Sequence, residues 1–334
     1  MNSEQSALFL YEEAMSYTYA AALRAAALIG VADHVAGGPR GLDELAEATG
    51  ARPDGLRRIL RILATRGIFH EEKPDVFGLT AAGDAMRADA PRSARSGILM
   101  FTDRLFWQTS HAVGDSVRAT DPSIAEFFGQ SIPDYFAAEP TTEALFYEGM
   151  EAVSDAENDL IAHACTWPEQ GTVADIGGRY GGFLRSVLMS HPLLHGILLD
   201  RADEVVKHRL DEPELAGRWE VVAGDFFTEV PPADVHVLKR IIHNWDDQQC
   251  VQILGTCRRA LRPGGRVLVI DAIVPPGEDS HQSKAMDFMM LAAFTGRERT
   301  AEELRPLFAD AGLRMTRVTA TSTPMSVIEA VVDE

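Results

Sequence analysis

Residues 173–182 read Val-Ala-Asp-Ile-Gly-Gly-Arg-Tyr-Gly-Gly, and they are the most informative stretch of the chain. An apolar run enters a glycine-rich turn, and residues 183–188 continue with apolar side chains at helical spacing. The pattern predicts a strand, a tight turn and the N-terminus of a helix. Because glycine has no Cβ, such a turn lets a nucleotide-like ligand approach the backbone closely. A diglycine after a strand is often only a turn, so a cofactor site needs further signals.

The acidic residues near this turn indicate which cofactor it suits. The spacing is D-x-G-G-x-x-G-G, with Asp175 inside the turn, and it differs from the G-x-G-x-x-G of pyrophosphate-binding turns. Asp200 lies 25 residues further on, at the end of the next apolar run, where a carboxylate is placed to bind ribose hydroxyls. Since an acidic side chain repels a pyrophosphate and suits a cation, these residues favour S-adenosylmethionine over a dinucleotide.

The bulk composition bounds the class of protein. The chain has 334 residues, enough for two domains, and a net charge of −19. That charge argues against a nucleic-acid or acidic-membrane partner, because phosphate binding needs clustered Lys and Arg. The three cysteines make neither a disulfide framework nor a common zinc spacing, which predicts buried free thiols and no metal. The N-terminal region lacks a signal-peptide pattern and residues 17–36 are a poor membrane span, so we expect a cytoplasmic protein.

Residues 1–90 predict a mainly helical domain that ends in a two-stranded wing. The expected helices and strands cover residues 20–35, 42–48, 54–66, 68–71 and 76–79. Three helices and a wing form a winged-helix pattern, whose usual use is DNA binding. The third helix supports that use with four arginines, Arg57, Arg58, Arg61 and Arg66. The region as a whole carries nine Lys and Arg against thirteen Asp and Glu, so we predict a dimerisation domain instead.

Residues 91–165 predict further helices that carry a dense set of aromatic side chains. We expect most of these rings to lie in a core. A few are expected to line an aromatic substrate pocket where this segment meets the next domain, because ligand sites favour apolar walls at domain interfaces. The segment is therefore interpreted as a helical linker that contributes to the pocket.

From residue 166 to residue 334, strands and helices alternate, which predicts an α/β fold. We expect a Rossmann-like domain with a mostly parallel, seven-stranded sheet, whose strands cover residues 172–175, 196–200, 219–223, 235–239, 266–270, 314–320 and 326–332. Polar residues follow five successive strands, at the edge where open α/β sheets bind ligands. In chain order they are Asp175 with Gly177, Asp200, Asp225, His243 and Asp271.

These motifs, taken in order, resemble a known family. The glycine-rich turn is followed by Gly-Asp-Phe-Phe at 224–227, L-K-x-x-x-H-x-W-x-D at 238–247, D-x-M-M at 287–290 and G-R-E-R-T at 296–300. The set is similar to that of small-molecule O-methyltransferases, which join a winged-helix-like dimerisation domain to a class I S-adenosylmethionine domain. That group includes plant caffeic acid O-methyltransferase and bacterial enzymes that tailor polyketide and antibiotic aromatics. The resemblance spans essentially the whole chain, is nearest to naphthoic acid O-methyltransferases of enediyne pathways, and implies a homodimer.

The resemblance implies a set of cofactor-binding residues. It assigns them to Asp175, Gly177, Asp200, Asp225, Phe226, Lys239 and Trp245, the last two completing the wall of the site. Gly177 would approach the methionine part of the cofactor and Asp200 would hold the ribose. Asp225 and Phe226 would frame the adenine. Tyr180 departs from the family pattern, which often has a smaller residue there, and this puts the fit of the turn around the cofactor in doubt.

The resemblance also implies His243 as the general base, with Asp271 and Glu298 flanking and orienting it. A phenol has a pKa of about 10 and a histidine of about 6.5, so full proton transfer before methylation would cost about 5 kcal/mol. We therefore expect proton removal to accompany methyl transfer. A carboxylate on the far ring nitrogen would fix the tautomer and stabilise the imidazolium.

The substrate pocket is less specified. The resemblance implies that Phe146, Asp287 and Met290 lie near the substrate, and we expect Trp107 and Met150 in the same wall. If the substrate is an aromatic carboxylic acid, the pocket also needs a cation. Arg104 and Arg297 are candidates for that cation from their positions alone, but we expect surface ion pairs for both.

Three alternatives remain at this point. The scaffold could be redirected to hydroxylation or decarboxylation, although such an enzyme need not keep His243, Asp271 and Glu298 together. A metal-dependent catechol methyltransferase would need a carboxylate cluster that the sequence does not display. The chain could also be a winged-helix regulator with a ligand-binding domain, in which case it would bind DNA.

Overall fold

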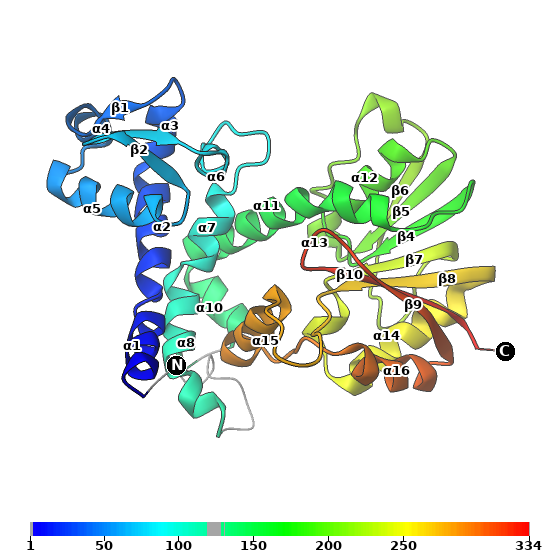
Figure 1. Ribbon diagram of the computed structural model, residues 1–334. Helices are drawn as coiled ribbons and strands as arrows, with labels where there is room; N and C mark the ends of the chain where they lie inside the picture. The colour runs from blue at the N-terminus through cyan, green and yellow to red at the C-terminus, as the bar shows by residue number, and fades with distance from the viewer. Residues whose placement is uncertain (1–2, 119–127, 130, 334) are drawn as a thin grey trace. The chain divides into compact units, whose positions relative to one another are not determined.

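Figure 1 shows the computed structural model, in which residues 3–118, 128–129 and 131–333 are described. The chain forms two compact units. One comprises Met1–Trp107 and Pro133–Val153, and the other comprises Gln108–Ile132 and Ser154–Glu334. No helix within the described ranges is both long and apolar enough to cross a lipid bilayer.

The N-terminal part of the first unit is helical. Its helices are α1 (Ser3–Ala14), α2 (Tyr17–Ile29), α3 (Val31–Val35), α4 (Leu42–Thr49) and α5 (Pro53–Ala64). The single helix predicted over residues 20–35 is divided at Gly30, which has a left-handed φ of 63° and ends α2. Glycine adopts this conformation without a Cβ clash, so it can end one helix and precede the next. The sequence pattern does not predict α1.

The predicted wing is present and has one more strand than expected. Strand β3 (Val76–Leu79) pairs antiparallel with β2 (Phe69–Lys73) on one side and with the short β1 (Arg40–Gly41) on the other. The apolar core of this region contains buried side chains from α2, α3, α4, α5 and the wing, and its largest fully buried members are Leu45, Leu56, Leu60, Leu63, Phe69 and Phe77. The apolar faces of the helices and of the wing strands therefore pack into one cluster, as the winged-helix pattern predicts.

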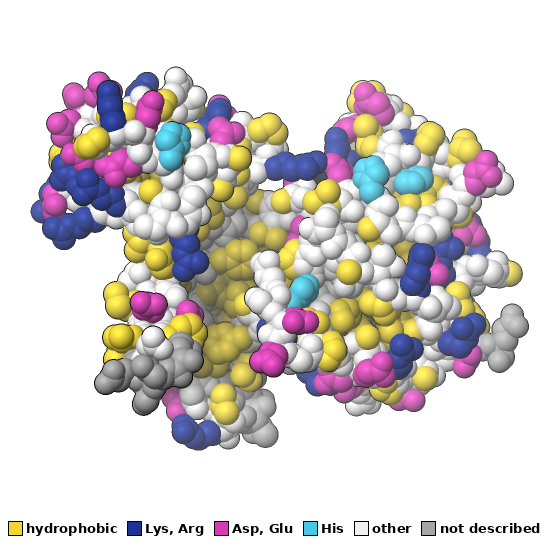
Figure 2. Space-filling view, viewed as in Figure 1, with side chains coloured by type: hydrophobic (Ala, Val, Ile, Leu, Met, Phe, Trp, Pro, Cys, Tyr) yellow, Lys and Arg dark blue, Asp and Glu magenta, His cyan; other side chains and the backbone are white. Residues whose placement is uncertain are grey.

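The four arginines of the predicted third helix, of which Arg66 lies just beyond the end of α5, all have partners within their own unit. Three form ion pairs: Arg57 with Asp75, Arg58 with Asp54 and Arg61 with Glu71. The guanidinium of Arg66 lies 4.1 Å from the centre of the Tyr19 ring. Figure 2 shows that basic side chains in this part of the molecule lie beside acidic ones. The arginines that favoured DNA binding in the sequence thus have partners among nearby side chains of the same domain.

The rest of the first unit is built from helices with packed aromatic side chains. The remaining helices up to residue 164 are α6 (Ala81–Asp84), α7 (Arg95–Phe101), α8 (Arg104–Ser116), α10 (Ile132–Ala138) and α11 (Pro140–Ala164). The rings of Phe136 and Phe146 have centres 5.2 Å apart, and Phe106 stacks on Phe146 at 6.4 Å. Helices α8 and α11 contribute residues to both units.

The second unit contains the predicted seven-stranded sheet, and the predicted α/β fold class is confirmed. The strands are β4 (Gly171–Ile176), β5 (Leu194–Asp200), β6 (Trp219–Ala223), β7 (Ala233–Lys239), β8 (Leu261–Asp271), β9 (Leu313–Ala320) and β10 (Ser326–Val332). Their order is β6-β5-β4-β7-β8-β10-β9. The five strands from β6 to β8 run parallel, and β10 pairs antiparallel with both β8 and β9.

Alternate residues of a strand point to opposite faces of the sheet, and here both faces carry apolar side chains. Helices therefore cover both faces. The helices that follow α11 in the chain are α12 (Gly182–Ser190), α13 (Ala202–Val205), α14 (Asp247–Ala260), α15 (Gln282–Ala293) and α16 (Ala301–Asp310), with short 3₁₀ turns η1 (Pro213–Leu215) and η2 (Ile242–Asn244). Of these, α12, α14 and α16 pack against the sheet. One apolar core lies between the sheet and α14 with α16, and a second lies between the sheet, α12 and the end of α11 (Figure 1). The strand order reverses between β4 and β7, so the crevice for a ligand is expected at the carboxyl ends of these strands.

Candidate active site

The glycine-rich turn leaves β4 at this reversal point. Gly177 has a φ of +71°, and its N–H donates to the Leu199 carbonyl at 2.8 Å. A Cβ at Gly177 would lie 2.5 Å from the Ile241 Cδ1 atom and 3.3 Å from the Phe226 ring. Both the backbone conformation and the close contacts therefore require glycine at this position.

Asp175 lies in β4, which corrects the expectation that it belongs to the turn. Its carboxyl is buried beneath Gly178, where a Cβ would come within 2.4 Å of it. Neither carboxyl oxygen has a hydrogen-bond partner of ordinary geometry among the described residues. Burial raises the pKa of Asp175 to about 7, although the positive charge of Lys239 opposes this rise. The Asp175 carboxyl thus packs against the backbone of the glycine-rich turn at Gly178.

Asp200 ends β5, and backbone amides hold its carboxylate. Its Oδ2 accepts from the Arg179 N–H at 2.8 Å, and its Oδ1 accepts from the Arg201 N–H at 2.7 Å. Burial raises the pKa of Asp200, while these two N–H groups lower it. The bulky residues of the turn are also accommodated, because the Arg179 side chain donates to Glu204 and to the Tyr180 hydroxyl, each at 3.0 Å.

An aromatic group lies beside the turn. Phe226 follows β6, and its ring centre is 6.1 Å from that of Trp245 in an edge-to-face arrangement. Phe227 approaches the same indole at 4.8 Å. Asp225 is exposed and accepts a hydrogen bond from the Phe227 N–H at 2.9 Å. The structure therefore brings Phe226, Trp245 and Gly177 together, with Asp225 at the edge of the group.

Lys239 ends β7 and is buried. Its ammonium donates to the Ser154 hydroxyl at 2.6 Å and to the Asn158 side-chain oxygen at 2.9 Å, both on α11. Burial lowers the pKa of Lys239 to about 8. Sequence reasoning missed Ser154 and Asn158. Their only signal is a pair of polar residues four apart on a helix, and that spacing does not reveal which strand end they meet.

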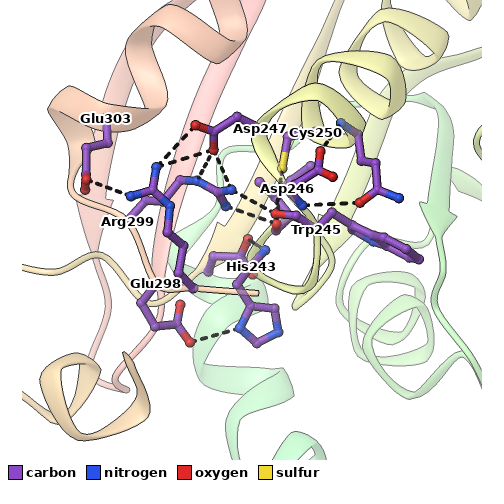
Figure 3. A network of polar contacts seen from close by, with 12 residues as sticks. His243, Trp245, Asp246, Asp247, Cys250, Glu298, Arg299 and Glu303 are labelled. Carbon is purple, nitrogen blue, oxygen red and sulfur yellow. Dashed lines mark hydrogen bonds and ion pairs between the residues drawn. The ribbon is translucent and has the colours of Figure 1, made fainter. Parts of the chain in front are cut away.

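His243 and Glu298 form the central pair of the site. His243 lies in η2, directly after β7, and its Nδ1 is 2.9 Å from Glu298 Oε1. The side chain of Glu298 is 1% exposed and that of His243 is 11% exposed, so this contact is shielded from water. Figure 3 shows the two side chains pointing toward one another, with the second ring nitrogen on the side away from Glu298.

Asp271 binds the backbone of the histidine. Asp271 is the last residue of β8. Its Oδ2 atom accepts a hydrogen bond from the backbone N–H of His243 at 3.2 Å. Burial raises the pKa of Asp271 to about 7, although His243 opposes this rise. Burial also disfavours a charged imidazole, but the hydrogen bond to Glu298 and the negative charge of Asp271 outweigh it, so the pKa of His243 lies above its usual value.

Two predicted substrate residues lie on α15. The Asp287 carboxylate accepts from the Glu298 N–H at 3.0 Å, and burial raises its pKa. Met290 is buried, with 5% of its surface exposed. Asp287 therefore holds the backbone of the residue that contacts His243. No group of three or more His, Cys, Asp or Glu side chains suited to a metal ion occurs in the described part of the chain.

The other predicted substrate residues belong to the first unit. Phe146 is part of the aromatic cluster described above, and Met150 lies half-buried on α11. Trp107 meets Tyr17 edge-to-face at 6.3 Å. The Arg104 guanidinium pairs with Glu139 at 2.9 Å and donates to the Tyr135 hydroxyl at 3.3 Å, so its charge is already engaged.

Comparison with known proteins identifies the family. The O-methyltransferase domain model matches residues 111–314, and the O-methyltransferase dimerisation domain model matches residues 11–89. The chain belongs to the O-methyltransferase family. The family and the enzyme class predicted from the sequence motifs are thereby confirmed, and the family uses S-adenosylmethionine.

Three relatives illustrate this membership. Phenazine O-methyltransferase PhzM of Lysobacter antibioticus is 34% identical, over 94% of this chain and 93% of its own. The crystal structure of CalO1, a methyltransferase in calicheamicin biosynthesis, is an S-adenosylhomocysteine-bound form; it is 59% identical, with a TM-score of 0.96 and 99% of each chain covered. NcsB1, from neocarzinostatin biosynthesis, was solved with S-adenosylmethionine and 2-hydroxy-5-methyl naphthoic acid. It is 34% identical, with a TM-score of 0.73, over 94% of this chain and 95% of its own.

Proposed function

We propose that this enzyme methylates a phenolic hydroxyl of a polyketide-derived aromatic in secondary metabolism, with a hydroxylated naphthoic acid as the first candidate substrate. The observation that carries the proposal is the shielded His243–Glu298 pair at the carboxyl edge of the sheet. Such a pair is suited to accepting a proton from a weakly acidic hydroxyl. The antibiotic pathways of CalO1 and NcsB1, and the naphthoic acid bound to NcsB1, support the substrate class.

The residues around the glycine-rich turn fit S-adenosylmethionine. Gly177 gives the turn a left-handed φ of 71° without a Cβ, which suits a tight turn whose backbone a ligand approaches closely. The carboxylate of Asp200 has its orientation held by two N–H groups and keeps lone pairs for ribose hydroxyls. Phe226 and Trp245 offer aromatic surface for an adenine. When bound, the cofactor supplies a methyl group that its sulfonium already activates.

In this proposal the chain's own residues position the hydroxyl and accept its proton. The Nε2 atom of His243 accepts the phenolic proton as the methyl group is transferred, because full transfer beforehand costs about 5 kcal/mol at ordinary pKa values. The raised pKa of His243 reduces this cost. Glu298 holds the Nδ1 proton, which fixes the tautomer and stabilises the imidazolium. Asp271 and Asp287 hold the backbones of His243 and Glu298, respectively.

The first test is calorimetric titration with S-adenosylmethionine and S-adenosylhomocysteine, with NAD as the control. We expect micromolar binding of the first two and none of NAD. The loaded enzyme should then methylate members of a panel of hydroxylated aromatic acids, and mass spectrometry would detect a gain of one methyl group. Absence of binding to both sulfur-containing ligands would refute the cofactor assignment.

Asp200→Ala tests the ribose assignment. We expect the affinity for S-adenosylmethionine to fall about 10–100-fold, since a hydrogen bond to a charged group contributes about 1.5–3 kcal/mol. Calorimetry measures this change directly. Asp203→Ala is the matched control, because Asp203 is an exposed acid on the following helix that pairs with Arg201. Equal affinities for the two variants would discredit the assignment.

We also propose a homodimer formed through the N-terminal domain. The match to a dimerisation domain supports it, and so do the apolar side chains that α1 exposes: Leu8, Phe9, Leu10 and Tyr11. Exposed apolar groups in such a number favour burial in a partner. Sedimentation velocity at micromolar concentration should give twice the chain mass of 36.5 kDa, and a monomer mass would contradict the proposal.

A further inference from the structure

Side chains from several parts of the chain bind the backbone of the turn that carries His243. It follows Arg240, whose φ of +57° is left-handed and costs free energy for a residue with a Cβ. The Ile242 and Trp245 carbonyls lie on either side of the histidine, and the Cys250 thiol, a weak donor, contacts both, at 3.3 Å and 3.5 Å. A second buried side chain binds the same two carbonyls with charged donors. That side chain is Arg299.

Arg299 spans the turn from one side to the other. Its Nη1 donates to the Ile242 carbonyl at 3.2 Å, and its Nη2 donates to the Trp245 carbonyl at 2.8 Å. Arg299 is 3% exposed. Its backbone is also fixed, because its carbonyl accepts a hydrogen bond from the Val274 N–H at 3.1 Å. A guanidinium has a rigid, planar set of donors, so it sets the distance between the two carbonyls it binds.

Glu298 and Arg299 are neighbours in sequence but act on different parts of the histidine. Figure 3 shows Glu298 directed at the imidazole ring, whereas Arg299 is directed at the turn that bears it. The segment before them adds close backbone contacts, because a Cβ at Gly296 would lie 2.0 Å from the His243 carbonyl oxygen. The same short segment thus holds both the ring and its backbone.

We infer that Arg299 is a positioning residue for His243: by clamping the two carbonyls that flank the histidine, it sets the imidazole where Glu298 and the substrate hydroxyl can both reach it. The expected effect on turnover rests on the proposed role of His243 as the base. The inference gives a function to an arginine of the G-R-E-R-T motif that neither the cofactor nor the substrate assignment uses.

An ion pair with Asp247 is the alternative reason for a buried arginine here. Asp247 Oδ1 lies 2.7 Å from Arg299 Nη2, but the same carboxylate also pairs with Arg297 at 3.3 Å. The Arg297 side chain is 47% exposed and pairs with Glu303 as well. Arg297 therefore shares the ion-pair partner and the segment, but of these two arginines only Arg299 binds the two turn carbonyls through its side chain. The contacts of the Cys250 thiol with the same carbonyls are unchanged in variants of either arginine.

The test compares Arg299→Met with the matched control Arg297→Met in the full-length protein. For Arg299→Met we expect kcat to fall about 10–100-fold, in the range that lost positioning produces, with KM for the aromatic substrate and the affinity for S-adenosylmethionine within about threefold of wild type. Arg297→Met should keep kcat within about twofold. If Arg299 acted only through its charge near Asp247, the two substitutions would lower kcat to a similar extent.

A second readout does not depend on catalysis. NMR titration of carbon-13-labelled histidine would follow the His243 ring, with the resonance assigned by its absence in His243→Ala. In Arg299→Met the loosened contact with Glu298 should lower the pKa of His243 toward its usual value, because that contact raises it. If His243→Ala retained full turnover, the proposed function would fail, and this titration would still decide whether Arg299 positions the ring.

Two further variants separate positioning from folding. Arg299→Lys keeps the charge beside Asp247 but cannot span both carbonyls, so it should fold with a near wild-type melting temperature and still lose about tenfold in kcat. Asp247→Asn keeps the clamp and should change kcat less than threefold. The inference is overturned if Arg299→Lys is fully active, or if Asp247→Asn is as impaired as Arg299→Met.

Discussion

His243→Ala is expected to lower the turnover of the full-length enzyme by about 10²–10⁴-fold, the usual contribution of a general base. Alanine removes the only group proposed to take the phenolic proton, and it leaves Glu298 without the ring that its Oε1 atom contacts. Steady-state kinetics with saturating S-adenosylmethionine would measure the loss. The affinity for the cofactor should stay near wild type, because the glycine-rich turn and Asp200 are unchanged.

A surface histidine supplies the control for this experiment. His163 is exposed on α11 and contacts the Asp159 carbonyl of its own helix, so His163→Ala should retain wild-type turnover. If His243→Ala turned over as fast as that control, His243 would not be the base. If His243→Ala instead lost cofactor affinity along with activity, the turn after β7 would have a structural role that masks any proton transfer.

Glu298→Gln is expected to lower turnover by about 10²–10⁴-fold, because replacing a carboxylate that orients a catalytic histidine favours the wrong tautomer. The variant should also change the pH dependence. His243 must be neutral to accept a proton, so turnover rises with pH through the pKa of His243. That pKa lies above about 6.5 in the wild type because the hydrogen bond to Glu298 and the charge of Asp271 outweigh burial.

Removing the carboxylate therefore moves the acid limb of the pH–rate profile to lower pH, while the plateau stays far below that of the wild type. The profile of kcat between pH 5 and pH 9 measures both effects in the same experiment. Glu302→Gln, at a highly exposed acid on α16, is the control and should match the wild type. A profile whose midpoint stays in place or moves to higher pH would show that Glu298 does not raise the pKa of His243.

The strands were the most predictable part of the fold. The predicted limits of the strands at 219–223, 76–79 and 326–332 coincide with β6, β3 and β10. Apolar alternation and flanking turn residues specify such strands locally. In contrast, β8 begins at Leu261, five residues before the predicted start, because the intervening Pro-Gly-Gly stretch resembles a turn. The break at Gly30 also went unpredicted, since an isolated glycine in an Ala-rich run is compatible with a continuous helix.

The candidate site was predictable where it depends on strand ends. Residues that follow parallel strands must gather at one edge of the sheet, so Asp200 and His243 could be grouped before any contact was known. The positions of individual carboxylates could not be deduced in this way. Asp175 is buried beneath the turn, and Asp271 binds a backbone N–H. A sequence gives the side-chain type, but it does not give the direction in which the side chain meets its partner.

The sequence alone was enough to predict the α/β class, the glycine-rich turn, the seven strands of the large sheet and the family, because these depend on local periodicity and on motifs of fixed spacing. The tertiary structure decided the contacts that make the site specific. His243 meets Glu298 across 55 residues, Lys239 meets Ser154 across 85, and Arg299 reaches the Ile242 carbonyl across 57. Such hydrogen bonds depend on how helices pack against the sheet, and no local pattern in the chain encodes the distance between two atoms so far apart in sequence.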